Sequence, residues 1–122
     1  MGKKILFIED DNILQKAIGE MLQKEGFECI SAFDGKEGLE KIKTEKPDLV
    51  LLDLILPRKD GFAVLEEMKK DEKTKEIPVI VLTNLEDFES LQKTMDKGVK
   101  AYLVKSEYSL EEVVQKIKET IK

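Results

Sequence analysis

Residues 47–57 read Pro-Asp-Leu-Val-Leu-Leu-Asp-Leu-Ile-Leu-Pro, and inside this stretch the apolar run Leu49-Val50-Leu51-Leu52 ends directly at Asp53. An apolar run without alternation is typical of a strand that is covered on both faces, as in a parallel sheet. Three further runs share this character: Ile5-Leu6-Phe7-Ile8, Val79-Ile80-Val81-Leu82 and Ala101-Tyr102-Leu103-Val104. The weaker run from Phe27 to Ala32 contains polar residues, which predicts a strand at the edge of the sheet.

Segments of helical length separate these runs, with apolar residues at a spacing of three or four. The apolar stripes are Ile13, Leu14, Ala17, Ile18, Met21 and Leu22; Phe62, Leu65 and Met68; Phe88, Leu91 and Met95; and Leu110, Val113, Val114, Ile117 and Ile121. Asp34 with Glu37, and Ser109 with Glu112, match the capping box that opens a helix. Gly26 is placed to end the first of these segments.

The chain therefore alternates strand and helix five times. This order predicts an α/β fold with a five-stranded parallel sheet and helices on both faces. Five strands favour the flavodoxin-like (βα)5 arrangement with strand order 2-1-3-4-5. The length fits one domain over residues 1–122, and no internal repeat or linker divides it.

The composition excludes several classes of function. The net charge is −5, with acids and bases mixed along the chain, which argues against direct binding of nucleic acid. No apolar run approaches the roughly 18 residues that span a bilayer, and no signal peptide is visible, so we expect a cytoplasmic protein. The single cysteine, Cys29, predicts a small buried hydrophobic residue rather than a redox centre. Because histidine is absent, any chemistry must run on carboxylates, hydroxyls and lysines.

Polar residues follow four of the predicted strands at the point where each ends. They are Glu9, Asp10, Asp53, Thr83 and Lys105. Taken singly, such a carboxylate is often the N-cap of the next helix, as we expect for Asp11 and Asn12, and a strand-end threonine or lysine is usually structural or solvated. In open α/β sheets, however, ligand sites form beyond the carboxyl ends of the strands, where the strand order reverses. Five polar residues at this edge therefore predict a shared site.

Three carboxylates in one place repel each other unless a cation neutralises them. Oxygen ligands without histidine or thiolate favour a hard ion, Mg²⁺ before Ca²⁺. Such an ion leaves an oxygen of Asp53 free to attack phosphorus, as aspartyl phosphate chemistry requires. Lys105 would balance the charge of the phosphoryl group, and the hydroxyl of Thr83 would donate to one of its oxygens.

With these residues in place, nearly the whole chain, from Lys3 to about Ile121, resembles the receiver domains of bacterial-type response regulators. The matching pieces are Ile5-Leu6-Phe7-Ile8-Glu9-Asp10-Asp11; Pro47-Asp48-Leu49-Val50-Leu51-Leu52-Asp53-Leu54-Ile55-Leu56-Pro57 with Asp60-Gly61-Phe62; Ile77-Pro78-Val79-Ile80-Val81-Leu82-Thr83; and Ala101-Tyr102-Leu103-Val104-Lys105. Each piece is weak alone, but the order and spacing of all four are highly specific.

The resemblance implies a phosphoryl-accepting switch of a two-component or phosphorelay system, a signalling phosphoprotein rather than an enzyme that acts on other substrates. Asp53 would take the phosphoryl group from a sensor histidine kinase or phosphotransfer protein. Asp10 and Asp53 would bind Mg²⁺ directly, Glu9 would bind it through water, and the backbone carbonyl of Ile55 would supply another oxygen.

The resemblance also implies a switch pair, Thr83 and Tyr102. Their movement would remodel the face formed by the fourth helix, the fifth strand and the fifth helix, through which a downstream protein target reads the signal. The sequence leaves open a monomer or a phosphorylation-dependent dimer. Tyr102 alone reads equally as a half-buried aromatic residue of an edge strand.

The chain departs from the family pattern beside the site. Ser106 follows Lys105 where the family usually has proline in a cis peptide, and a non-proline cis bond costs about 3–4 kcal/mol, so we expect a trans peptide and a differently set Lys105. Asn84 replaces a small residue and narrows access to the phosphoryl group. Ile55 and Leu85 are apolar at positions that tune attack by water, so we expect slow self-dephosphorylation.

Three other classes of protein compete with this interpretation. A receiver-like interaction module that works without phosphorylation is the main alternative, and the retained site residues argue against it. A phosphatase of the haloacid-dehalogenase type generally needs a second aspartate two residues after the first, where this chain has Ile55. A flavodoxin-like FMN binder needs a small-residue phosphate loop after the first strand, where Glu9, Asp10 and Asp11 would repel the phosphate.

Overall fold

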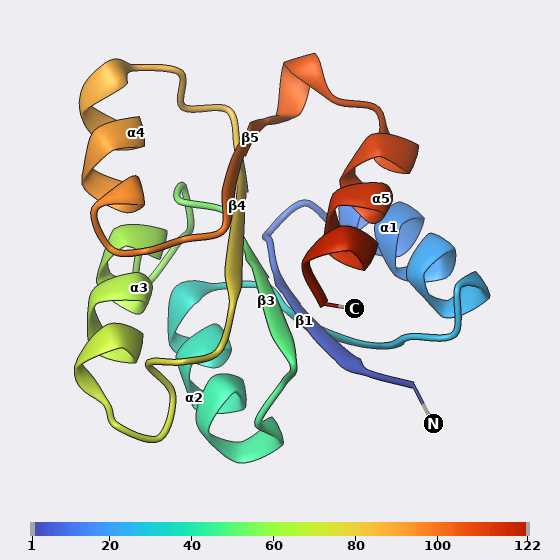
Figure 1. Cartoon of the computed structure of the whole chain (residues 1–122), viewed down its shortest axis with the longest axis horizontal. Helices are drawn as coiled ribbons and strands as arrows, with labels where there is room; N and C mark the ends of the chain where they lie inside the picture. Colours follow the sequence, from blue (N-terminus) through green and yellow to red (C-terminus); the bar gives the residue numbers. More distant parts are fainter. Residues whose placement is uncertain (1, 122) are drawn as a thin grey trace.

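The computed structural model describes residues 2–121, which form a parallel five-stranded sheet between two layers of helices (Figure 1). The strands are β1 (Lys4–Ile8), β2 (Glu28–Ala32), β3 (Leu49–Leu52), β4 (Val79–Thr83) and β5 (Ala101–Val104). Their order is β2-β1-β3-β4-β5, and all neighbours are parallel, as predicted. The weakly apolar β2 is an edge strand, which the mixture of polar residues predicted.

The helices are α1 (Asn12–Lys24), α2 (Gly35–Glu45), α3 (Gly61–Lys70), α4 (Phe88–Met95) and α5 (Leu110–Ile121). In Figure 1, α1 and α5 cover one face of the sheet, and α2, α3 and α4 lie on the other. Alternate strand residues point to the two layers: Leu6 and Val50 pack with α2 and α3, whereas Phe7 and Leu51 pack with α1 and α5. The three central strands are therefore buried on both faces, which is why their sequences are continuously apolar.

Short polar side chains fix where the helices begin. Asp11 caps α1 by accepting hydrogen bonds from two backbone N–H groups, which confirms its expected role, whereas Asn12 is the first residue of that helix. Ser109 and Glu112 form the predicted reciprocal capping box. At α2, the Asp34 carboxylate accepts a hydrogen bond from the N–H of Glu37, as predicted. The return bond of the box differs: the Glu37 carboxylate accepts from the N–H of Phe33, the residue before the cap, and not from the N–H of Asp34.

The predicted apolar stripe of α4 is wrong in part. Phe88 is 72% exposed and Met95 is 43% exposed, and the buried residue of this helix is Thr94. The reason is positional, because α4 lies at the β5 end of the sheet and covers little of it (Figure 1). Ile13, assigned to the stripe of α1, is likewise 83% exposed, at the first turn of its helix.

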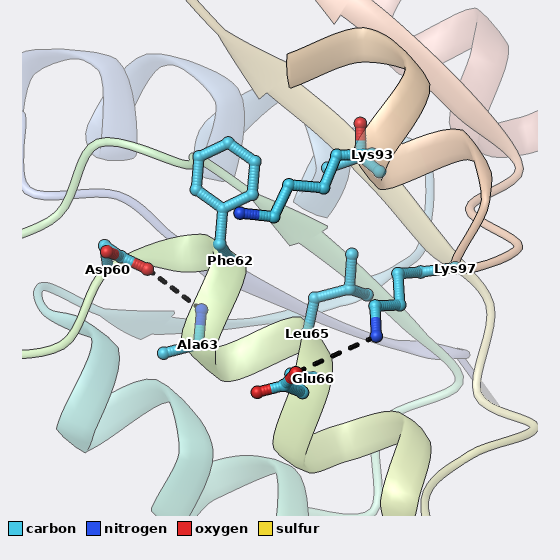
Figure 2. Close-up of a pocket in the computed structure, with 8 residues that line it drawn as sticks. Asp60, Phe62, Ala63, Leu65, Glu66, Lys93 and Lys97 are labelled. Atoms are coloured by element: carbon cyan, nitrogen blue, oxygen red, sulfur yellow. Dashed lines mark hydrogen bonds and ion pairs between the residues drawn. The ribbon is translucent and has the colours of Figure 1, made fainter. Parts of the chain in front are cut away.

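Two contacts made by lysines of α4 and the segment after it join this part of the chain to α3 (Figure 2). The ammonium of Lys93 lies 4.7 Å from the centre of the Phe62 ring, and Lys97 Nζ lies 3.9 Å from an oxygen of Glu66. A hollow of about 250 Å³, lined in part by Leu65, remains between the two helices. The helix is therefore loosely seated, as expected of an element with few buried apolar contacts.

Arg58, in the loop between β3 and α3, has a φ of 69°, in the left-handed region. A side chain costs about 1–2 kcal/mol there, whereas glycine costs about 0.5–1 kcal/mol in unfolded-chain entropy. The ion pair of Arg58 with Asp34, at 3.7 Å and with the arginine side chain 61% exposed, contributes little. We therefore expect Arg58→Gly to raise the free energy of unfolding by about 0.5 kcal/mol in urea titrations. A lower value would show that the ion pair outweighs the strain.

Cys29 is half-buried in β2 and packs against the α1–α5 layer. Burial raises the pKa of its thiol from 9.0 to about 11. Because the thiolate is the nucleophile, a higher pKa leaves less of it at any pH below 11. Iodoacetamide at pH 8 should modify Cys29 about a hundredfold more slowly than an unperturbed thiol, with the rate rising about tenfold per pH unit. Modification as fast as that of glutathione, followed by intact mass, would contradict this.

Candidate functional site

The register of the strands brings the predicted site residues to one edge of the sheet. Ile8 pairs with Leu52 of the neighbouring strand, so that Glu9 and Asp53, which follow them, leave the sheet at the same level. The backbone fixes both positions, because the N–H of Asp53 donates to the carbonyl of Ile8 at 3.1 Å and the N–H of Glu9 donates to Ala32 at 2.9 Å. Both carboxylates are buried: Glu9 is 1% exposed and Asp53 is 3% exposed.

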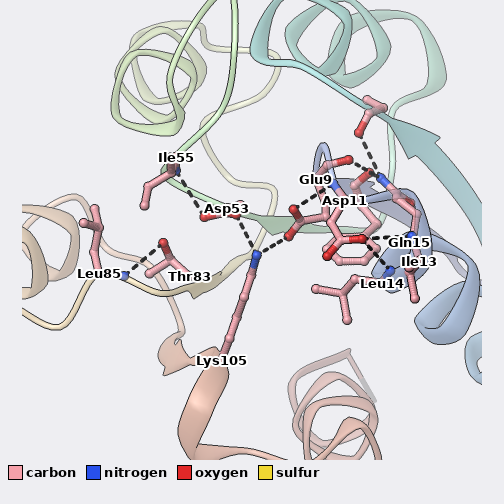
Figure 3. A network of polar contacts seen from close by, with 12 residues as sticks. Glu9, Asp11, Ile13, Leu14, Gln15, Asp53, Ile55, Thr83, Leu85 and Lys105 are labelled. Atoms are coloured by element: carbon pink, nitrogen blue, oxygen red, sulfur yellow. Dashed lines mark hydrogen bonds and ion pairs between the residues drawn. The ribbon is translucent and has the colours of Figure 1, made fainter.

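Lys105 reaches both buried carboxylates (Figure 3). Its Nζ lies 2.7 Å from Oε1 of Glu9 and 2.9 Å from Oδ2 of Asp53. Among residues 2–121 no peptide bond is cis, so the peptide before Ser106 is trans, as expected. Residues Lys105–Glu107 form a short 3-10 helix, and from this position the ammonium bridges the two acids instead of pairing with one.

The two carboxylates have unequal electrostatic environments. Burial raises the pKa of Glu9 to about 7; the contact with Lys105 opposes this shift, and the charge of Asp53 adds to it. Burial alone would lower the pKa of Lys105, but its contacts with the two carboxylates raise it above its ordinary value. Lys105 is therefore held as a cation between two acids. Its single positive charge faces the carboxylates of Glu9, Asp10 and Asp53.

The acidic residues also fit a metal ion. Oxygen atoms of Glu9, Asp10 and Asp53 all lie within 4.8 Å of one another, and Asp10 is exposed to solvent. Oε1 of Glu9 is buried and, apart from its ion pair with Lys105, has no hydrogen-bond partner. A set of three carboxylates, with no nitrogen or sulfur ligand among them, suits a hard, hydrated cation.

Ile55 supports Asp53 through its backbone. Its N–H donates to Oδ1 of Asp53 at 3.1 Å, which leaves Oδ2 to Lys105 and fixes the plane of the carboxylate (Figure 3). The side chain of Ile55 is 53% exposed, beside the opening of the site. The predicted metal-binding role of its carbonyl oxygen stays a prediction.

The predicted switch pair is connected through a third residue. Thr83, at the end of β4, is fully buried, and its hydroxyl accepts from the N–H of Leu85 at 3.4 Å. The hydroxyl of Tyr102 donates to the carbonyl of the same Leu85 at 2.9 Å. Burial raises the pKa of Tyr102, and the nearby charge of Asp87 adds to this. The Leu85 backbone therefore links the strand-end hydroxyl to the aromatic ring on β5.

Sequence reasoning missed Gln15, which is 4% exposed in the first turns of α1. Its Nε2 donates to the backbone carbonyls of Phe7, Glu9 and Ala32 at 2.9, 3.1 and 2.9 Å (Figure 3). Because a side-chain amide has only two protons, one of these bonds is shared. The contact fastens the end of β1, and with it Glu9, to β2. The sequence did contain a signal for this role: Gln15 is a polar residue three positions before Ile18, on the face of α1 that is buried.

Comparisons with known proteins agree with this geometry. The family model "Response regulator receiver domain" matches residues 5–118. A CheY-like receiver domain protein from Methanospirillum hungatei superposes with a TM-score of 0.91 at 30% identity, over 99% of this chain and 94% of its own. The Mn²⁺-bound form of response regulator Rcp1 superposes with a TM-score of 0.85 at 34% identity, over 96% of this chain and 92% of its own. The transcriptional regulator RpaA of Synechocystis is 34% identical over 94% of this chain and 47% of its own length.

The chain belongs to the response regulator receiver domain family. Its homologues are response regulators, which are signalling proteins rather than classical enzymes. The chain spans about half the length of the curated relatives that it matches first, 47% and 48%. Within residues 2–121, no helix combines the length and the apolar character needed to cross a membrane.

Proposed function

We propose that this chain is a phosphoryl switch in which Asp53 accepts a phosphoryl group from a sensor histidine kinase or a phosphotransfer protein. The observation that carries the proposal is a buried aspartate, 3% exposed, whose carboxylate is oriented by Lys105 and the Ile55 N–H beside two further acids. A carboxylate this well oriented is prepared for in-line attack on phosphorus. The P–N bond of the donor breaks as the acyl phosphate P–O bond forms.

The residues around Asp53 would act mainly through charge. Lys105 would follow the oxygens of the incoming phosphoryl group, and the hydroxyl of Thr83 would turn from Leu85 to donate to one of them. Asp10 and Asp53 would hold Mg²⁺ directly, Glu9 would hold it through water, and the carbonyl of Ile55 would complete the protein ligands. The ion neutralises the charge of three acids and the phosphoryl oxygens, which otherwise repel each other.

The link from Thr83 through Leu85 to Tyr102 suggests how the signal leaves the site. If the Thr83 hydroxyl turns toward a phosphoryl group, the N–H of Leu85 loses its hydrogen-bond acceptor. The backbone of Leu85 is then free to move, and Tyr102, whose hydroxyl donates to the Leu85 carbonyl, would move with it. The loosely seated α4 would then shift, and a downstream protein would read the α4-β5-α5 face. The chain would act either as a monomer or as a phosphorylation-dependent dimer that pairs through this face.

The proposal is tested with Mg²⁺ and acetyl phosphate, a small donor, by intact mass. We expect one added phosphoryl group on the wild-type chain, and none on Asp53→Ala or in the presence of EDTA. Removal of the donor then reports self-dephosphorylation, which we expect to be slow because Ile55 and Leu85 are apolar; decay within seconds would contradict this part. If no adduct forms under any condition, the phosphorylation-independent interaction module replaces the switch.

A further inference from the structure

A groove away from the Asp53 site runs along the exposed side of α2. It consists of two neighbouring hollows of about 300 and 280 Å³, and Lys43 lines both of them. Lys59 of the loop before α3 lines one hollow, and Lys73 of the segment after α3 lines the other. We call it the lysine groove; its lining comprises Lys36, Leu39, Glu40, Ile42, Lys43, Lys46, Lys59, Asp71, Lys73 and Thr74.

The charge of the lysine groove is opposite to that of the whole chain. Its lining has five lysines against Glu40 and Asp71, whereas the chain carries a net charge of −5. Asp71 is engaged locally, because its carboxylate accepts from the backbone N–H of Lys73 at 2.9 Å. The groove therefore presents an excess of positive charge in an otherwise acidic protein.

Four of these lysines have no carboxylate partner. Among residues 2–121, Lys36, Lys43, Lys46 and Lys73 take part in no ion pair. Lys59 pairs with Glu67, and the charge of Lys43 also helps to lower the pKa of Glu67. Ammonium groups gathered in this way repel each other, and an anionic ligand would relieve the repulsion.

The shape of the groove narrows the class of ligand. Ile42 is fully buried, so the apolar part of the lining comes from Leu39, which is 8% exposed, and from the aliphatic stems of the lysines. The distance along α2 from Lys36 to Lys46 is about 15 Å at the helical rise of ~1.5 Å per residue. An extended peptide covers this length with about five residues. A flat lipid surface would contact the lysines but would leave the two hollows between them empty.

We propose that the lysine groove binds an extended acidic segment, about five residues long, of a partner protein. Acidic side chains would pair with the lysines, and one or two apolar side chains between them would lie over Leu39 and the aliphatic stems of the lysines. The groove lies outside the Asp53 cluster and the α4-β5-α5 face, so this contact is independent of the phosphoryl chemistry and adds a second docking surface to the domain.

The test uses a fluorescein-labelled peptide, Glu-Leu-Glu-Glu-Leu, and fluorescence anisotropy with the whole chain. We expect saturable binding that Lys43→Glu with Lys46→Glu weakens by at least about tenfold, since two attractive contacts become repulsive. The matched control is Lys16→Glu with Lys24→Glu, exposed residues of α1 that carry the same change in net charge. This control should bind within about twofold of wild type, because distant charges are screened at physiological salt.

Other outcomes would overturn the proposal. Equal losses in both double variants would mean that only the overall charge of the chain matters. No saturable binding by the wild type would mean that the lysine groove is not a peptide site. Concentration-dependent dimers in sedimentation, abolished by Lys43→Glu with Lys46→Glu, would assign the groove to a second copy of this chain. Binding to phosphatidylserine vesicles with the same sensitivity, but not to the peptide, would assign it to a lipid surface.

Discussion

Lys105→Met should lower the free energy of unfolding by about 2–3 kcal/mol in the absence of Mg²⁺. The substitution keeps the length and the packing of the side chain but removes its charge. Glu9 and Asp53, both nearly inaccessible to solvent, would then face each other without the ammonium that now lies 2.7 and 2.9 Å from them. We place the expected loss below the full cost of an unpaired buried charge, because Lys105 is 18% exposed and water can partly replace it.

Millimolar Mg²⁺ should restore more than half of the stability that Lys105→Met loses, because a divalent cation neutralises the same oxygens. Urea unfolding with Mg²⁺ and with EDTA measures this difference. Lys116→Met is the matched control: its ion pair with Glu119, at 3.8 Å, is exposed, so stability should change by less than about 0.5 kcal/mol. Phosphoryl acceptance by Lys105→Met should slow by about a hundredfold. If Mg²⁺ left the loss of stability unchanged, the acids around Lys105 would not form the metal site.

Gly61→Ala should cost about 2–3 kcal/mol of stability and disturb Asp53. A Cβ at this position would lie 2.3 Å from the backbone oxygen of Asp53 and 2.6 Å from Cα of Leu54. Backbone atoms cannot turn aside as a flexible side chain can, so the turn before α3 must shift. The N–H of Gly61 also donates to the carbonyl of Leu54 at 2.9 Å, and a shift weakens this bond.

Gly19→Ala is the control for Gly61→Ala. There the added Cβ meets only Sγ of Cys29, at an ordinary 3.7 Å, in the middle of α1. This substitution should raise the free energy of unfolding by about 0.5–1 kcal/mol. The prediction for Gly61 fails if Gly61→Ala unfolds at the same urea concentration as wild type and accepts phosphoryl groups at the wild-type rate.

The apolar strands between the two helix layers explain why the fold could be predicted from the sequence. Strands covered on both faces are apolar at nearly every position, so β1, β3 and β4 could be recognised without knowledge of their neighbours. The fourth continuous run, β5, is also apolar, but it is a half-buried edge strand. The alternation of strand and helix then leaves few topologies, and strand order follows from a preference common to such chains. The apolar stripe of α4 misled because burial of Phe88 and Met95 depends on how far the sheet extends beneath that helix.

The sequence by itself determined which chemical groups stand at the carboxyl edge of the sheet, because strand ends are visible as the points where apolar runs stop. Only the tertiary structure decided how these groups interact: Lys105 bridges two acids, Gln15 ties Glu9 to β2, and the pKa of Glu9 rises to about 7. Each of these facts depends on distances between residues far apart in the chain and on the exclusion of water. Neither quantity is written in local sequence, because both arise when the sheet closes and its helices cover it.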